Sequence, residues 1–206
     1  MSRHTQRTLR QIARRRLSIF LIAAMAVISV ISIWGCGKSG SAGLHIKSAA
    51  TGEKDVAVKS SYTFAVTKTF TDVNNKITTA SAYNVYVANY DLDSANFAMT
   101  MDKPLTSDDQ VRVMFSLIGD EGTNDKSPLK AGTYSAKADK YMKAETAGIV
   151  SRKGGSDNKA WFDRSTLSGQ VKITSATADE ISGDVDLMAG DNAIKGSFTA
   201  KVLKRK

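Results

Sequence analysis

The chain has 206 residues, with 29 Lys or Arg against 20 Asp or Glu, one cysteine and two histidines. A single cysteine excludes an internal disulfide, and so few histidines leave a Cys/His zinc centre or a Ser-His-Asp triad without its parts. Six arginines lie in residues 1–36, which contain no acidic residue, so the rest of the chain has 23 basic residues against 20 acidic ones. The formal net charge of +9 therefore comes mainly from the N-terminal segment and does not indicate nucleic-acid binding.

The N-terminal segment has the order of an export signal. A basic stretch ends at Arg16, and an uncharged apolar run follows over residues 17–34. Arginine side chains stay on the cytoplasmic side while the apolar run enters the bilayer. This order predicts that the remainder of the chain is exported and stays tied to a membrane.

The residues Ile33-Trp34-Gly35-Cys36 close the apolar run, and a stretch rich in Gly, Ser and Ala follows. This tetrapeptide resembles the lipobox of bacterial lipoproteins, although Trp34 stands where that family has a small residue. The resemblance implies signal cleavage between Gly35 and Cys36 and acylation of the Cys36 thiol. The run Leu17–Trp34 is also long enough to span a bilayer as an uncleaved signal anchor, so both forms of attachment stay open.

The composition divides the chain into three parts. Residues 1–35 form the signal peptide, residues 36–50 form a lipid-attached flexible tether, and residues 51–206 form a single domain. In that domain, runs of alternating apolar and polar residues recur in chain order, at 62–70, 83–88, 97–101, 111–117, 171–173, 181–187 and 194–202. A period of two buries one face of a strand.

The expected fold is all-β, an antiparallel sandwich or barrel-like domain of about eight to ten strands. The last three runs, with their turns, predict a three-stranded meander, in which Asp184 and Asp186 face outward beside Lys195, Ser197 or Lys201. Residues 134–150 have a helix-forming composition, which leaves room for one short helix.

Acidic residues are the remaining candidates for catalysis or metal binding. The loops 91–96 and 120–125 are rich in oxygen ligands but lack EF-hand spacing and its closing Glu, and turns favour Asp, Asn and Gly for backbone reasons. Asp184 and Asp186 share an outward face, which favours a solvated sheet over a glycosidase pair. We predict no catalytic residue, no metal and no cofactor.

Aromatic residues suggest a contact surface. Trp161 and Arg164 follow a polar loop, and Tyr86 and Tyr90 share one face of a predicted strand. Tryptophan, tyrosine and arginine are frequent in binding hot spots. The alternative is that Tyr86 belongs to a strand buried on both faces and that Trp161 closes one end of the core.

Together these features predict a non-catalytic, membrane-anchored lipoprotein of the cell envelope, whose β-domain binds or supports an envelope protein or a glycan. One alternative is a carrier that holds an apolar ligand in a barrel cavity. A Ca²⁺-dependent hydrolase that uses carboxylates is a third hypothesis. In the lipoproteins that this chain resembles, Asp after the cysteine retains the protein in the inner membrane. Gly37 stands there, which implies the outer membrane in a double-membraned host.

Overall fold

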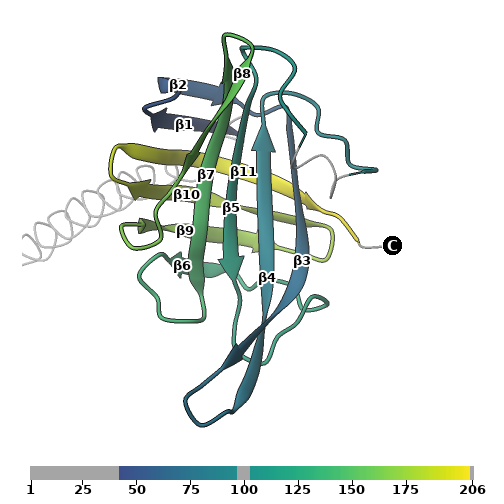
Figure 1. Cartoon of the computed structure of the whole chain (residues 1–206). Coiled ribbons are helices and arrows are strands. Elements are labelled where there is room, and N and C mark those ends of the chain that lie inside the picture. Colours follow the sequence, from purple (N-terminus) through teal and green to yellow (C-terminus); the bar gives the residue numbers. More distant parts are fainter. Residues whose placement is uncertain (1–41, 97–102, 205–206) are drawn as a thin grey trace, which may run out of the picture. The chain divides into compact units, whose positions relative to one another are not determined.

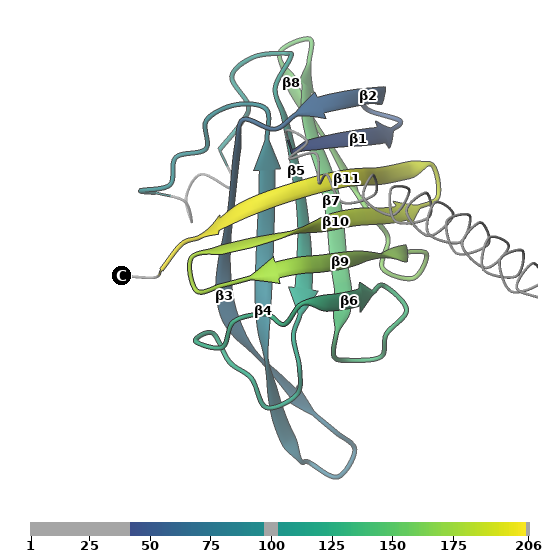
Figure 2. The ribbon, with the colours of Figure 1, turned by 180° about the vertical axis from the view of Figure 1, so that it is seen from behind.

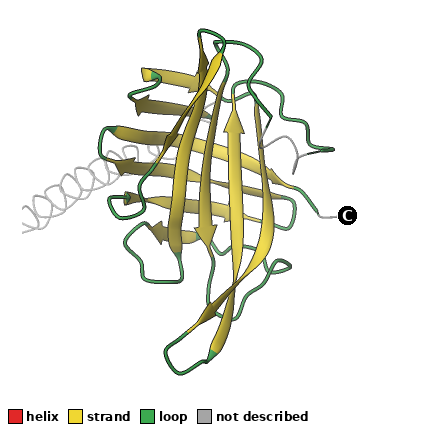
Figure 3. Cartoon of the chain, viewed as in Figure 1, coloured by secondary structure: helices red, strands yellow, loops and turns green. Residues whose placement is uncertain are grey.

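The computed structural model describes residues 42–96 and 103–204, and this part of the chain contains strands and no helix (Figure 3). The all-β prediction is confirmed, whereas the short helix expected in 134–150 is wrong, because strands β6 and β7 occupy its two ends. The strands are β1 (Gly43–Ser48), β2 (Gly52–Ala57), β3 (Ser60–Thr71), β4 (Ile77–Ala88), β5 (Val111–Ile118), β6 (Gly132–Ser135), β7 (Lys143–Lys153), β8 (Ser156–Trp161), β9 (Ser168–Ala176), β10 (Glu180–Ala189) and β11 (Asn192–Val202).

Eight strands close into a barrel in the order β3, β4, β5, β7, β6, β9, β10, β11, with β11 returning to β3. Strands β3, β4, β5 and β7 form one layer, and strands β6, β9, β10 and β11 cross behind them (Figure 1). The same crossing is seen from the other side in Figure 2. Strand β8 extends the first layer beyond β7, and the β1–β2 hairpin extends the second beyond β11. Of the two architectures left open by the sequence, the barrel is therefore the one found.

The meander predicted at the end of the chain is present as β9, β10 and β11. Its register places Asp184 opposite Ser197 and Asp186 opposite Lys195. The Asp186 carboxylate lies 3.4 Å from the Lys195 ammonium. Opposite charges facing one another across two strands add a few tenths of a kcal/mol each. The two outward acids thus belong to a charged sheet surface.

Two parallel contacts join the layers, and they are the exceptions to the predicted antiparallel pairing. At the β6–β7 seam only Ser135 pairs with Lys143. At the β3–β11 seam Lys201 pairs with Tyr62 and Val202 with Thr63. Beyond these few pairs the strands of the two layers run in different directions and separate. Each seam therefore depends on side chains for its closure.

A single apolar cluster from both layers fills the interior of the barrel. Tyr134, Phe115 and Phe198 are the largest of its fully buried side chains. The rings of Phe115 and Phe198 meet edge to face, with centroids 5.1 Å apart. An eight-stranded barrel is just narrow enough for side chains to fill it. The middle of this barrel is accordingly occupied by aromatic side chains from β5, β6 and β11.

Part of the segment predicted as a tether belongs to the β-sheet, as the strand that pairs with β11. Residues 43–48 form β1, in which Leu44 and Ile46 are buried and Gly43 lies opposite Ser197 of β11. A Cβ on Gly196 would lie 2.2 Å from the carbonyl oxygen of Gly43, so only glycine permits this approach of β1 to β11. The tether was predicted too long because β1 has only two large apolar residues, Leu44 and Ile46. So short an alternation is hard to recognise in a segment rich in Gly, Ser and Ala. The described residues all belong to one compact unit.

The described residues contain no helix that is long and apolar enough to cross a membrane. The signal peptide, its apolar run over 17–34 and the predicted lipid attachment at Cys36 lie outside the described residues, as does the strand predicted at 97–101.

Candidate functional site

Trp161 ends β8, and its side chain is 55% exposed. The indole ring lies against Gly148 of β7, where a Cβ would lie 2.7 Å from the ring atom Cε3. Glycine at this position lets the ring rest on the outer face of the sheet, as aromatic residues do beside edge glycines. Arg164 follows in an exposed turn. The partial exposure predicted for Trp161 is therefore present, and its role in binding remains a proposal.

Tyr86 does not belong to an exposed surface, so its assignment to a contact surface is wrong. It lies in the same cross-strand row as Trp161, with Met114 and Gly148 between them. However, its side chain is only 5% exposed, and its ring stacks on Phe64 with centroids 6.2 Å apart. The reason is that β4 is buried on both faces, by the barrel interior and by an outer cluster.

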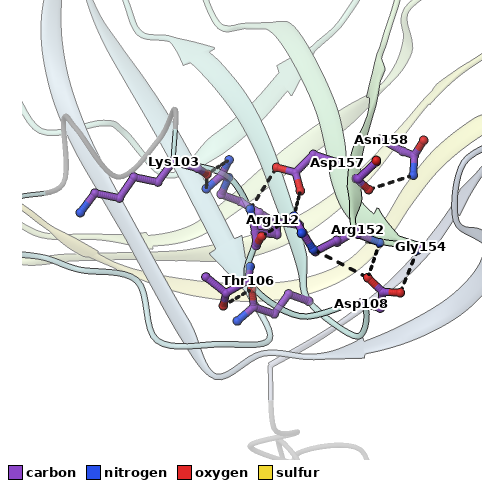
Figure 4. A network of polar contacts seen from close by, with 12 residues as sticks. Lys103, Thr106, Asp108, Arg112, Arg152, Gly154, Asp157 and Asn158 are labelled. Atoms are coloured by element: carbon purple, nitrogen blue, oxygen red, sulfur yellow. Dashed lines mark hydrogen bonds and ion pairs between the residues drawn. The ribbon is translucent and has the colours of Figure 1, made fainter.

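Tyr90 packs against the same outer cluster, and its hydroxyl binds a buried arginine, Arg112, which Figure 4 labels. Arg112 of β5 is 4% exposed, and its Nη1 donates to the Tyr90 hydroxyl at 3.2 Å. Both terminal nitrogens also approach the carbonyl oxygen of Lys103 at 3.5 Å. Burial raises the pKa of the Tyr90 phenol, although Arg112 acts in the opposite direction. Tyr90 thus supports a structural contact.

A second arginine in Figure 4 completes this network. Arg152 Nη1 donates to the carbonyl oxygen of Leu105 at 2.7 Å and to the Asp157 carboxylate at 3.1 Å. The same Asp157 accepts the Leu105 amide at 3.0 Å, and Asp108 accepts the Gly154 amide at 2.8 Å. These bonds tie the segment before β5 to strands β7 and β8. The arginines serve the fold here, because their donors are directed at protein groups.

The acidic loops are also held by internal partners. Asp91 lies 2.8 Å from the Lys59 ammonium, and Asp120 lies 2.5 Å from that of Lys130. Asp93 accepts hydrogen bonds from Asn96, which lower the pKa of its carboxyl group. The described residues contain no group of three His, Cys, Asp or Glu side chains that could hold a metal ion.

His45, which the sequence places in the tether, lies on β1 between two carboxylates. Its Nδ1 lies 2.8 Å from Asp55 and its Nε2 lies 3.0 Å from Glu53. Hydrogen bonds to Asp55 and then Glu53 raise the pKa of the imidazole. The trio is exposed to solvent, and it pins the β1–β2 hairpin together.

A concave site lies where β3 and β11 separate. We call it the seam cleft. Its volume is about 320 Å³, within the range of small-ligand sites. Six of its residues are apolar or aromatic and three are charged. The lining residues are Ala65, Tyr83, Asp125, Lys126, Pro128, Ala178, Val202, Leu203 and Lys204. Sequence reasoning missed this site, because its residues come from five separate parts of the chain.

The loop between β5 and β6 forms one wall of the seam cleft and is fastened to the barrel. The Tyr83 hydroxyl donates to the carbonyl oxygen of Ser127 at 3.0 Å, and burial raises the pKa of this phenol. The Thr67 hydroxyl donates a hydrogen bond to the Asp125 carboxylate at 3.0 Å. The backbone amide of Asp125 in turn donates to the Thr67 hydroxyl oxygen at 3.0 Å. The cleft is therefore preformed, with a fixed wall.

The charges that line the seam cleft are not equivalent. Lys204 lies 3.0 Å from the carboxylate of Asp179, and Asp125 is occupied by Thr67. Lys126 is exposed, and its ammonium has no ion-pair partner among residues 42–96 and 103–204. The carboxylate of Asp125 likewise has no ion-pair partner among the described residues, so the lining combines apolar side chains with one unpaired charge of each sign.

A buried hydroxyl adjoins the lining of the seam cleft. Thr63 is fully buried, and its Oγ1 has no hydrogen-bond partner among the described residues. It pairs with Val202 and lies two positions before Ala65, and both of these residues line the cleft. An unsatisfied buried hydroxyl costs about 1–3 kcal/mol. This part of the seam therefore contains a polar group whose hydrogen-bonding capacity is not met by the described residues.

With this geometry the protein is defined as an all-β domain built on a closed eight-stranded barrel. No protein-family model matches the chain, and no curated protein or solved structure matches it either.

Proposed function

We propose that this chain is a non-catalytic, membrane-anchored protein of the cell envelope that binds a small, partly apolar ligand. The observation that carries the proposal is the seam cleft, a preformed concave site lined by six apolar or aromatic residues and three charged ones. Binding sites for small molecules have this character, in which apolar surface supplies affinity and a few polar groups fix orientation. This refines the carrier hypothesis by moving the ligand from the barrel centre to the β3–β11 seam.

The anchoring part of the proposal rests on the N-terminal sequence. The basic stretch, the apolar run and the lipobox-like residues 33–36 support attachment through Cys36, with an uncleaved anchor as the alternative. Because β1 begins at Gly43, residues 37–42 alone would join the lipid to the barrel. An extended chain of this length spans roughly 20 Å. The barrel would thus stay close to the bilayer, where amphiphilic ligands are concentrated.

The proposal assigns no reaction to the seam cleft. Its titratable groups are Tyr83, Asp125 and two lysines, and the phenol of Tyr83 is kept protonated by its raised pKa. Asp125 Oδ1 accepts the Thr67 hydroxyl, and the lining contains no histidine and no second acidic residue that could act with Asp125 as an acid–base pair. A general base must reach the proton that it removes. Binding is therefore the function that these residues support best.

The test uses a soluble fragment that starts at Ser41 and the neutral dye N-phenyl-1-naphthylamine, whose fluorescence rises in apolar surroundings. We expect saturable binding to the unmodified fragment. Ala65→Phe places a ring in the cleft and should abolish that binding. The matched control is Ala57→Phe, which adds the same ring at an exposed position of β2 and should leave binding unchanged. Equal binding by Ala65→Phe and the unmodified fragment would refute the proposal.

Attachment is tested separately in the full-length protein. Cys36→Ala should abolish metabolic labelling with a fatty acid and leave a precursor that retains residues 1–35. The physical reason is that the thiol is the atom to which the lipid would be bonded. Labelling that persists in the variant would rule out Cys36. An unlabelled wild type that keeps residues 1–35 would establish the uncleaved anchor instead.

A second candidate function rests on the exposure of Trp161. A large aromatic side chain that is 55% exposed at the end of an outer strand can serve as a contact for an envelope protein or a glycan. Arg164 lies in the next turn. Isolation of partners from native envelope with the wild type and with Trp161→Ala tests this function. Identical partners in both samples would count against it.

A further inference from the structure

We infer that the tip of the β3–β4 hairpin is a second membrane contact, which inserts the side chains of Val73 and Ile77 into the lipid surface. The inference rests on the anchoring part of the proposed function and is independent of the seam cleft. It adds a preferred orientation of the barrel on the bilayer to the attachment at the N-terminus.

The β3–β4 hairpin projects beyond the other strands of the barrel (Figures 1 and 2). Strand β5 pairs with β4 only as far as Ala82, which lies opposite Ile118. Past that pair, residues 67–71 of β3 stay paired with residues 77–81 of β4, and the turn 72–76 joins them. The turn is therefore held away from the barrel, where it can meet a flat surface.

The tip of this hairpin concentrates exposed apolar side chains. Four large hydrophobic side chains are exposed in residues 42–96 and 103–204, and two of them lie at this tip. Val73 is 98% exposed and Ile77 is 67% exposed. Single exposed apolar residues are common on protein surfaces, whereas grouped ones mark sites that contact a partner or a membrane.

The turn satisfies its own backbone, as a segment that enters the low-dielectric lipid surface must do. The amides of Asn74 and Lys76 donate to Asp72 Oδ1 at 2.8 Å and 2.9 Å. The Asn75 amide donates to the Asp72 carbonyl oxygen at 3.1 Å, and the Asp72 amide donates to the Lys76 carbonyl oxygen at 3.1 Å. These donors need no water, so the tip can present its apolar side chains to lipid at a low desolvation cost.

The hairpin is also braced from the segment between β6 and β7 and from β7 itself. The Tyr141 ring meets that of Phe70 edge to face, with centroids 5.4 Å apart, and the Tyr141 hydroxyl lies 2.6 Å from that of Thr78. Lys68 of β3 forms an ion pair with Glu145 of β7. A braced hairpin loses little conformational freedom when it inserts, which favours a contact made by few side chains.

The bilayer is the partner that the proposed anchor brings within reach. Residues 37–42 span roughly 20 Å when extended, so an anchored barrel can tilt until the tip meets the lipid. The tether makes this second contact intramolecular, and a weak contact is then well populated. The turn 72–76 contains one acidic and one basic residue, so apolar burial drives the contact and no anionic lipid is required.

The experiment uses the full-length protein in vesicles of zwitterionic phosphatidylcholine. A genetically encoded photoreactive amino acid with a diazirine side chain replaces Val73. In the matched control it replaces Met188, an exposed apolar residue of β10. Flotation first separates the protein that is bound to vesicles. Mass spectrometry then measures lipid adducts at the substituted position after illumination.

We expect lipid adducts at position 73 well above those at position 188. Ile77→Asn should lower the ratio of inserted to free hairpin, and with it the adduct at position 73, by up to about ten-fold, the factor for losing the burial of one aliphatic side chain. Met188→Asn removes an exposed apolar side chain elsewhere and should leave the adduct at position 73 unchanged.

The outcomes separate the hairpin from the anchor. Equal adducts at positions 73 and 188 in vesicle-bound protein, or full labelling in Ile77→Asn, would overturn the inference and leave the anchoring intact. Protein that does not float with the vesicles would overturn both, because no attachment would exist. In native envelope membranes, adducts of position 73 with a protein in place of lipid would assign the tip to a protein interface and refute the membrane contact.

Discussion

The two seams at which the layers of the barrel join, β6–β7 and β3–β11, differ in how their side chains pack. At the β6–β7 seam, Tyr134 is fully buried and its hydroxyl donates to the carbonyl oxygen of Lys130 at 2.9 Å. The Ser135 amide also donates to the carbonyl oxygen of Met142 at 3.0 Å. At the β3–β11 seam a cleft remains, lined by Ala65 of β3, Tyr83 of β4 and Val202 of β11.

This difference shows what decides whether a join between two crossed layers is sealed. Both seams have very few backbone pairs, so hydrogen bonding alone closes neither of them. The difference lies in the side chains: Tyr134 is fully buried at one seam, whereas the residues around Ala65 leave a cleft of about 320 Å³ at the other. Protein interiors are packed as densely as organic crystals, so the open cleft at the β3–β11 seam is a departure from ordinary packing.

The largest effect is expected from opening the sealed seam. Tyr134→Ala should lower the free energy of unfolding by about 3–5 kcal/mol, the range for removing a buried aromatic side chain. Urea denaturation of the fragment from Ser41 measures this loss. Tyr134→Phe is the matched control and should cost only about 1 kcal/mol, because it removes one hydrogen bond and keeps the ring. A loss below about 1 kcal/mol for Tyr134→Ala would show that this ring does not seal the barrel.

A smaller effect of opposite sign is expected at the other seam. Thr63→Val replaces a buried hydroxyl without a partner by a methyl group of similar size, and should raise stability by about 1 kcal/mol. Thr123→Val is the contrasting variant, because that hydroxyl accepts the Ser81 amide at 2.8 Å and donates to the Asp120 carbonyl at 2.6 Å. It should lower stability by a similar amount. Thermal denaturation compares the two, and a destabilised Thr63→Val would reveal a partner for its hydroxyl.

Trp161 provides a further contrast, since it is an aromatic residue that closes no seam. Trp161→Ala should lower the free energy of unfolding by about 1 kcal/mol, because the ring is half exposed and packs on one side only. Before mutation, acrylamide should quench its fluorescence efficiently in the fragment from Ser41, where it is the only tryptophan. An emission that resists quenching, with a loss of about 3–5 kcal/mol, would place Trp161 in the core.

The smallest effect concerns pH and the hairpin beside the β3–β11 seam. Because Asp55 and Glu53 raise the pKa of His45, the protonated imidazole favours the folded state. This contribution is complete below the unfolded pKa of about 6.5 and is lost as the pH rises through the higher folded value. NMR titration of His45 should give a pKa above 6.5, and Asp55→Asn should lower it. An unchanged pKa in Asp55→Asn would contradict the assigned cause.

Local patterns predicted the strands well, and long-range contacts explain what they did not predict. The alternation in residues 171–202 led directly to β9, β10 and β11, because neighbouring strands joined by short turns pair with one another. Barrel closure depends on Thr63 meeting Val202 and Ser135 meeting Lys143, and no local pattern records such pairs.

In the candidate site, too, local features were predicted and long-range contacts were not. The exposure of Trp161 was predicted from its place after a polar loop, which is a local feature. The seam cleft was not, because Ala65 and Lys126 approach one another only in the folded barrel. Tyr86 was misplaced since an alternating strand does not reveal a covering on its second face, where Tyr90 and Leu92 pack.

The most direct test of the account is to map a ligand on the barrel by NMR. N-phenyl-1-naphthylamine is added to the isotopically labelled fragment from Ser41, and the amide shifts are followed. The account predicts saturable changes that are concentrated at Ala65, Lys126 and Val202, and their absence from Ala65→Phe. Changes centred on Trp161 or on the β1–β2 hairpin, or no saturable change at all, would contradict the claim that the open seam is the binding site.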